Sequence, residues 1–303
     1  MNPIKLYILI PILLILPASY IQSADTSKVI SADSIPKDAV PFEYDFKMKK
    51  MILIPGTLND SRPFKYWLET GMGTMTFSDD LASKVEKQKV QNGFYKVQKK
   101  TKVRIGHWEK IYGGSVYARY LDKNNFAFRF SGAVGIIPWQ FFDKKIIEIS
   151  FSKQYIRELS DTKDLQNYDS VKIKVENGML GIPVVVSVQG KKIKVFVLID
   201  TGYNGDISFS NSIVSKYDIK SDSAHFGESH IPGGVEKGFS LRSDTIQVGE
   251  FLLTEKSYIS FSQNKQRPYP FSGLIGTGIL DRFDMVLDLR NYNLYLKRID
   301  NKK

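Results

Sequence analysis

Short apolar runs, separated by turns that contain Gly, Pro or Asn, fill the chain from Phe46 onward, and they predict strands. The expected strands cover residues 51–55, 64–68, 99–112, 115–121, 126–130, 171–175, 184–188, 193–199, 285–289 and 293–296. One helix is expected at 79–90, where apolar residues share a face behind an N-cap at Ser78 or Asp79. Gly113-Gly114 is expected to form a hairpin turn.

One of these strands ends at a carboxylate. Five apolar residues, Val195 to Ile199, run directly into Asp200-Thr201-Gly202. Gly202 allows a tight bend there because it has no Cβ atom to clash. The tripeptide is common by chance, so by itself it identifies nothing.

Comparison of the chain with itself finds a second copy of this arrangement upstream. Tyr66-Trp67-Leu68 leads into Glu69-Thr70-Gly71, so a glutamate stands where the later copy has Asp200. Five further matches pair Ile54-Pro55 with Ile182-Pro183, Thr76–Ser78 with Ser208–Ser210, Ser83-Lys84 with Ser215-Lys216, Ser131–Gly135 with Ser272–Gly276, and Phe142-Asp143 with Phe283-Asp284. The pattern predicts an internal duplication over roughly residues 45 to 299.

The later copy continues into a glycine-rich segment, Phe271 to Gly278. Together with Asp200-Thr201-Gly202, this order resembles the aspartic peptidases, in both their single-lobe retropepsin-like and two-lobe pepsin-like forms. Leu274-Ile275-Gly276 is similar to the apolar-apolar-Gly segment of that family. The resemblance implies a mainly β, bilobal fold, with two related β-barrel-like lobes, short helices and a cleft between the lobes. It also implies a short helix at 279–283 and a closing hairpin at 285–296.

The resemblance implies a hydrolytic site as well. In that family, one carboxylate from each lobe shares a proton with the other, and the pair activates a water that attacks the peptide carbonyl. The residues implied are Asp200 and Glu69 as the catalytic pair, supported by Thr201, Gly202, Thr70 and Gly71. No metal and no cofactor is expected. The partner is a peptide or protein substrate, and the protein is expected to be a monomer.

Glu69 departs from the family pattern. Its extra methylene moves the carboxylate by more than the ~0.5 Å that catalytic positioning tolerates. Three interpretations follow: an active endopeptidase, an inactive relative that binds peptides or envelope components in the cleft, and a dimer that pairs two copies of Asp200. The duplication makes such a dimer unnecessary.

Two glycine-rich stretches are candidates for flaps that close over a substrate. They are Tyr112-Gly113-Gly114 and the Gly233-Gly234 tip, and each lies between a carboxylate motif and a closing segment. Tyr112 or Trp108 would supply the flap aromatic. For both stretches the alternative is a plain exposed hairpin.

The expected domain organisation has six parts. Residues 1–24 carry a lysine, an apolar run and small residues, as in a secretory signal peptide. The run is broken by Pro11 and falls short of the ~20 residues of a membrane span, so an uncleaved anchor is the minor alternative and no stable span is expected after cleavage. Export to the periplasm or the extracellular space follows. The rest is divided into a flexible leader at 25–44, an N-terminal lobe at 45–159, a linker at 160–170, a C-terminal lobe at 171–299 and a tail at 300–303.

The composition argues against several other catalytic mechanisms and partner classes. The chain has no cysteine, which excludes disulfides, thiolate metal sites and cysteine nucleophiles. It has three histidines and neither the His-Glu-x-x-His nor the Gly-x-Ser-x-Gly motif, so zinc and serine hydrolases lack their usual signatures. The net charge is +11, but the lysines are scattered without an aromatic stripe. This favours a solvated surface, an anionic envelope or an acidic substrate, and no nucleic acid partner is expected.

Overall fold

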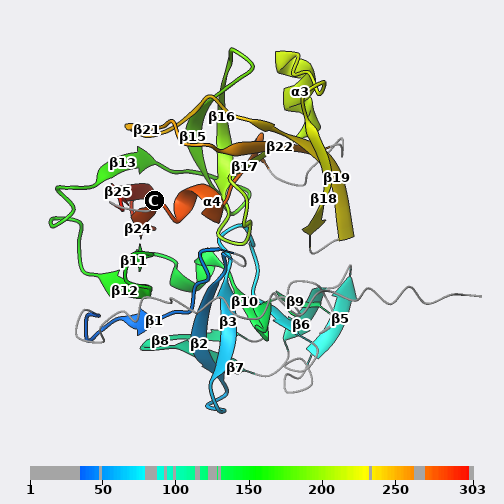
Figure 1. The fold of residues 1–303 in the computed structure, drawn as a ribbon. Helices are drawn as coiled ribbons and strands as arrows, with labels where there is room; N and C mark the ends of the chain where they lie inside the picture. Colours follow the sequence, from blue (N-terminus) through cyan, green and yellow to red (C-terminus); the bar gives the residue numbers. More distant parts are fainter. Residues whose placement is uncertain are drawn as a thin grey trace, which may run out of the picture. The chain divides into compact units, whose positions relative to one another are not determined.

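Three β-sheets make up most of the structure, a computed structural model (Figure 1). It describes residues 35–47, 50–78, 87–91, 94–97, 100–112, 117–121, 128, 131–231, 234–262 and 270–299. The expected signal peptide and the expected tail therefore lie outside the described residues. Ile35 opens the unit that contains all three sheets.

The first sheet is formed by the N-terminal half of the chain. Its strands are β2 (Ile52–Leu58), β3 (Phe64–Leu68), β4 (Thr76–Ser78), β5 (Lys87–Gln91), β6 (Phe94–Val97), β7 (Thr101–Ile105), β8 (Trp108–Tyr112), β9 (Tyr117–Leu121) and β10 (Gly135–Ile137). They lie in the order β5-β6-β9-β4-β10-β3-β2-β7-β8. A short 3₁₀ helix, η3 (Trp139–Phe142), follows β10.

The second sheet is formed by the C-terminal half. Its strands are β14 (Lys174–Glu176), β15 (Met179–Val188), β16 (Lys191–Ile199), β17 (Ile207–Phe209), β18 (His225–Ile231), β19 (Gly234–Arg242), β20 (Thr245–Val248), β21 (Phe251–Leu253), β22 (Tyr258–Ser262) and β23 (Gly273–Ile275). The order is β18-β19-β22-β17-β23-β16-β15-β20-β21, with β14 paired to β15. The helix α3 (Asn211–Tyr217) follows β17, and α4 (Thr277–Leu280) follows β23.

The two large sheets share one connectivity. Every strand of the first sheet has a counterpart at the same place in the second sheet, and the counterparts follow one another in the same order along the chain. For example, β5 corresponds to β18 at one edge, and β8 corresponds to β21 at the other. This is the mainly β, two-lobe architecture that the sequence predicted.

The third sheet takes strands from both halves. They are β1 (Val40–Pro41), β11 (Ile146–Ser150), β12 (Tyr155–Leu159), β13 (Asp169–Lys172), β24 (Phe283–Asp288) and β25 (Asn293–Arg298). The order is β1-β12-β11-β24-β25-β13, so the two halves meet where β11 pairs antiparallel with β24. The β24–β25 pair is the expected closing hairpin.

Alternating burial explains why β15 and β16 become the central pair of the second sheet. In β15, Val184, Val186 and Val188 point into the core, and the residues between them are at least partly exposed. In β16 the alternation stops, and the last three residues, 197–199, are all fully buried. Each fully buried aliphatic side chain contributes roughly 1.5–3 kcal/mol. The end of β16 is therefore held tightly where the chain reaches Asp200.

Some expected elements were wrong. The helix expected at 79–90 fails at its end, because residues 87–91 form β5, which pairs with β6; residues 79–86 lie outside the described part. The stretch 99–112 is two strands, β7 and β8, with their turn at Gly106 in a left-handed conformation (φ 55°). The flexible leader also ends earlier than expected, because Val40–Pro41 pairs with β12 and Phe42 is buried. The linker likewise ends before residue 169, where β13 begins.

Candidate active site

Two strands deliver the predicted carboxylates in the same way. β3 leads into Glu69 and lies parallel to β10, while β16 leads into Asp200 and lies parallel to β23. The amide of Glu69 donates to the carbonyl of Ile137 at 3.0 Å, and the amide of Asp200 donates to that of Ile275 at 3.0 Å. The two carboxylate residues therefore occupy equivalent positions in the two lobes.

This register corrects the glycine-rich alignment made from the sequence. Because Ile137 and Ile275 hold equivalent places, Gly135 corresponds to Gly273 and not to Gly276, a shift of three residues. A Cβ atom on Gly135 would lie 3.0 Å from the carbonyl oxygen of Thr76, and one on Gly273 would lie 2.3 Å from that of Ser208. Each glycine allows the neighbouring strand to approach closely.

The two threonines join the loops. The Thr70 amide donates to Oγ1 of Thr201 at 3.1 Å, and the Thr201 amide donates to Oγ1 of Thr70 at 3.1 Å. The hydroxyl of Thr70 then donates to the carbonyl of Ile199 at 2.8 Å, and that of Thr201 to the carbonyl of Leu68 at 2.8 Å. Both side chains are almost completely buried. Four reciprocal hydrogen bonds thus hold the loops face to face.

Each carboxyl group lies against the glycine of the opposite loop. A Cβ atom on Gly71 would lie 2.5 Å from Cγ of Asp200, and a Cβ atom on Gly202 would lie 2.5 Å from Cδ of Glu69. The two carboxyl carbons are therefore equally far from the Cβ positions of the opposing glycines, although the glutamate side chain is one methylene longer. Both residues are 7% exposed. The amide of Gly202 also donates to Oδ1 of Asp200 at 2.9 Å.

Alanine at either glycine is expected to displace the opposing carboxyl group. Contacts of 2.5 Å are shorter than real Cβ contacts, so Gly71→Ala should move Asp200 and Gly202→Ala should move Glu69. Any hydrolytic activity should fall about 100-fold or more, since a misplacement near 1 Å has that effect. Peptide cleavage rates measure the change. Gly73→Ala is the matched control, because its Cβ atom would contact only Gln140, at 3.9 Å; equal effects at positions 71 and 73 would contradict the argument.

Small apolar clusters flank the carboxylates on the two lobes. Trp67 and Ile136 belong to one cluster, and Leu198 and Leu274 belong to the other. Tyr203, three residues after Asp200, packs against the second cluster. The site is therefore a pair of buried carboxyl groups between apolar side chains, where electrostatic interactions are stronger than in water.

Thr277, which the sequence argument did not single out, is hydrogen-bonded to the loop that follows Asp200. Its amide and its hydroxyl both donate to the carbonyl of Tyr203, at 2.8 and 3.0 Å, and the hydroxyl also lies 3.0 Å from the carbonyl of Lys50. A Cβ atom on Gly276 would lie 2.3 Å from the same Tyr203 oxygen. The Gly-Thr-Gly sequence at 276–278 was the available signal, since glycines on both sides of a threonine allow close backbone contact.

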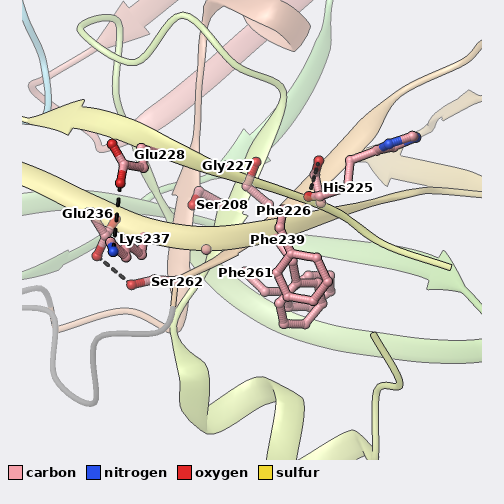
Figure 2. A pocket seen from close by; sticks show the side chains of 13 residues that line it. Ser208, His225, Phe226, Gly227, Glu228, Glu236, Lys237, Phe239, Phe261 and Ser262 are labelled. Atoms are coloured by element: carbon pink, nitrogen blue, oxygen red, sulfur yellow. Dashed lines mark hydrogen bonds and ion pairs between the residues drawn. The ribbon is translucent and has the colours of Figure 1, made fainter. Parts of the chain in front are cut away.

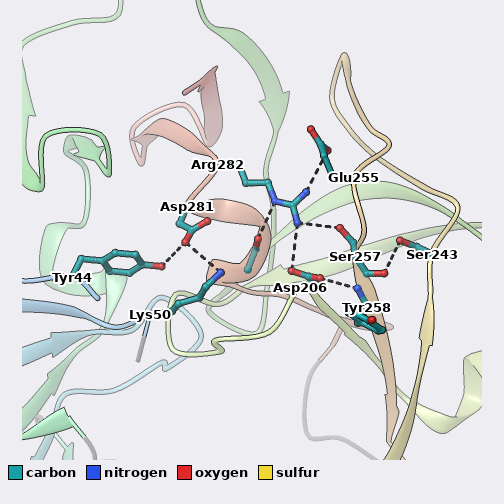
Figure 3. A network of polar contacts seen from close by, with 10 residues as sticks. Tyr44, Lys50, Asp206, Ser243, Glu255, Ser257, Tyr258, Asp281 and Arg282 are labelled. Carbon is teal, nitrogen blue, oxygen red and sulfur yellow. Dashed lines mark hydrogen bonds and ion pairs between the residues drawn. The ribbon is translucent and has the colours of Figure 1, made fainter. Parts of the chain in front are cut away.

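Polar side chains anchor α4 at its C-terminal end (Figure 3). Asp281 accepts a hydrogen bond from the hydroxyl of Tyr44 at 3.1 Å and lies 3.4 Å from Nζ of Lys50. Burial, and then the Asp281 carboxylate, raise the pKa of Tyr44 above its usual range, so the phenol keeps its proton. On the other side, Arg282 lies 3.7 Å from Asp206 and donates to Ser257 at 3.1 Å. These contacts hold the segment that supports the site.

The structure places the described flap candidates in different surroundings. Tyr112 lies in the edge strand β8 and is buried in the core, and Trp108 is buried with its indole donating to Glu158. Neither is a flap aromatic, so that interpretation was wrong; Gly113, Gly114 and Gly233 lie outside the described residues. Gly234 pairs with Ile231 at the end of the β18–β19 hairpin. The shared strand order makes β5–β6 the equivalent hairpin of the first lobe.

No group of three or more His, Asp or Glu side chains suited to a metal is found among the residues that the structure describes. Within the same residues, no helix combines the length and the apolar character needed to cross a membrane.

Comparison with known proteins supports the fold. No family model and no curated protein matches the sequence. Among solved structures, an aspartic proteinase from Irpex lacteus is similar, with a TM-score of 0.53 and 12% sequence identity, over 86% of this chain and 97% of that one. The chain therefore has a bilobal, pepsin-like aspartic protease fold, which confirms the expected fold class.

Proposed function

We propose that this protein is an aspartic-type endopeptidase in which Asp200 and Glu69 activate a water molecule between them. The observation that supports this most strongly is the reciprocal fit of the loops. Each carboxyl carbon lies 2.5 Å from the Cβ position of the opposing glycine, so the extra methylene of Glu69 is accommodated where Gly202 has no side chain.

The chemistry follows from two mostly buried carboxyl groups on loops that are hydrogen-bonded to each other, each group lying against the opposing glycine. Like charges so placed favour one shared proton, because both groups ionise together only at a high energetic cost. The ionised group takes a proton from the water, which attacks the scissile carbonyl. The protonated group hydrogen-bonds the carbonyl oxygen and later protonates the leaving amine. The amide of Gly202, which donates to Asp200, favours the charged form on that residue.

Export forms part of the proposal. The pattern of residues 1–24 supports a cleaved signal peptide, and a cysteine-free chain is compatible with an oxidising compartment. The mature enzyme would then act as a monomer in the periplasm or outside the cell.

Substitution of Glu69 by glutamine tests the proposal. Glutamine keeps the size of the side chain but cannot exchange a proton, so kcat should fall about 10²–10⁴-fold, the usual contribution of one acid–base group. The measurement is cleavage of a mixed peptide library between about pH 3 and pH 7, with and without an inhibitor that carries a statine-type hydroxyl. Glu250→Gln, at an exposed turn position, is the control and should retain full activity.

The inactive, peptide-binding interpretation makes a different forecast. It expects no cleavage by the unsubstituted protein, and unchanged peptide binding in a variant with amides at both positions 69 and 200. Cleavage that survives Glu69→Gln would also reject the proposed pair, since Glu69 would then take no part in the proton transfer.

A further inference from the structure

A cavity of about 190 Å³ lies on the second lobe, against β17, β18, β19 and β22 (Figure 2). Its volume is small compared with the roughly 300–1,000 Å³ of sites for drug-sized ligands. The size therefore suits one long side chain.

The cavity lies on the same face of the sheet as Leu198, which is two residues before Asp200. Paired residues in neighbouring strands point to the same face. One row of such pairs crosses six strands in the order Leu198, Leu274, Ser208, Ser260, Ser240 and His225. The row begins two residues before Asp200, and residues two apart in a strand share a face. The last four members line the cavity.

Tyr203 links the cavity to the candidate active site. Its backbone follows the Asp200 loop, and its hydroxyl donates to Oγ of Ser260 at 3.4 Å. From β16 to β19 the path is four strand spacings, or roughly 19 Å at ~4.8 Å each. An extended peptide advances ~3.3 Å per residue. A substrate side chain in the cavity would therefore belong to a residue within about six positions of the cleaved bond.

The polar side chains that line the cavity are serines, His225, the pair Glu228 and Lys237, and a buried carboxylate, Glu236. Glu236 is 6% exposed and accepts a hydrogen bond from the hydroxyl of Ser262. Glu228 also borders the cavity, but it is paired with Lys237 in the strand register, and their charges lie 3.9 Å apart. By strand alternation, Glu228 and Lys237 share the sheet face of Phe226, whereas Glu236, four residues from Ser240, shares the face of the serine row.

The cavity also has room for a ligand. A Cβ atom on Gly227 would meet nothing within 4 Å, so the space beside this strand residue is open. The phenylalanines 226, 239 and 261 pack on one another, with Phe239 and Phe261 stacked at 5.0 Å. They fix the strands below the polar face.

We propose that this cavity is a specificity pocket that takes a lysine or arginine side chain of the substrate, with the cation against Glu236. The proposal rests on the proposed endopeptidase function and names its substrate class. Serine hydroxyls would accept the remaining N–H groups, and the low exposure of Glu236 would strengthen the ion pair relative to one in water.

The test compares matched peptides that carry lysine or norleucine at each position within six residues of the cleaved bond. For the unsubstituted protein, kcat/KM is expected to be about 10- to 100-fold higher with lysine at one position, which corresponds to one buried charged contact. Glu236→Gln should remove this preference, so that kcat/KM for the lysine and norleucine peptides differs by less than about threefold. Glu228→Gln, which removes the same charge from the same hairpin, should retain the preference.

A second variant guards against a folding defect in Glu236→Gln. Gly227→Leu should fill the open space and abolish the lysine preference without touching the carboxylate. The proposal is overturned if the unsubstituted protein shows no preference for a basic residue, or if both variants keep it. If no peptide is cleaved at all, the endopeptidase proposal fails. Binding of the same peptides to Asp200→Asn, with and without Glu236→Gln, then decides the pocket separately.

Discussion

Replacing Asp200 by asparagine is expected to abolish peptide cleavage, with a fall in kcat of about 10³-fold or more. Asparagine accepts a hydrogen bond from the Gly202 amide as aspartate does, so the loop should keep its conformation. It has no carboxylate to take a proton from water. The melting temperature should therefore change little while activity is lost, and thermal unfolding beside single-turnover cleavage measures both.

The control for this result is Asp218→Asn. Asp218 is ion-paired with Lys220 on the surface and has a left-handed backbone (φ 49°) that asparagine tolerates well. It should keep full activity. If Asp200→Asn cleaves peptides as fast as Asp218→Asn does, Asp200 has no role in hydrolysis.

Replacing Thr201 by valine is expected to give the largest loss of stability. Valine keeps the shape but leaves the Leu68 carbonyl and the Thr70 amide without their hydrogen bonds, in a fully buried place. Each such group costs about 1–3 kcal/mol, so the free energy of unfolding should fall by about 2–6 kcal/mol. At about 2–4 °C per kcal/mol for a chain of this size, the melting temperature should drop on the order of 10 °C.

Two further variants separate the hydrogen bonds from packing. Thr201→Ser keeps the hydroxyl and should lose much less stability. The double variant Thr70→Val/Thr201→Val should lose less than the sum of the two single changes, because the residues exchange their hydrogen bonds. Strict additivity would show that the two loops are not coupled through these side chains.

The sequence predicted the strands that carry the site because their apolar runs end abruptly at polar tripeptides. The buried run at 197–199 and the Asp-Thr-Gly corner need no tertiary information to be recognised. The matching tripeptide at 69–71 was also visible. The sequence did not disclose that the carboxyl carbons of Glu69 and Asp200 lie equally far from the Cβ positions of the opposing glycines. That equality depends on how the two lobes pack.

The errors have physical reasons. The three-residue shift in the glycine-rich segment arose because Ser-Gly occurs in both copies, although strand pairing follows the apolar residues before Pro138 and Gly276. The helix expected up to Val90 yielded to pairing with β6, since tertiary context overrides local propensity. The flap aromatic was wrongly assigned to Tyr112 or Trp108 because Gly113-Gly114 is a typical turn dipeptide, but so is Asn92-Gly93, the dipeptide most typical of two-residue hairpins.

The sheet shared by both halves has a mechanical consequence. Strands β11 and β24 pair over four residues, from Ile146 with Asp288 to Ile149 with Met285, so an unbroken ladder crosses from one half to the other. Movement of one half against the other cannot occur by a hinge in the segment after Leu159 alone, because this ladder would have to twist or shear as well. Substitutions along this ladder would therefore change how easily the loops of Glu69 and Asp200 move relative to each other.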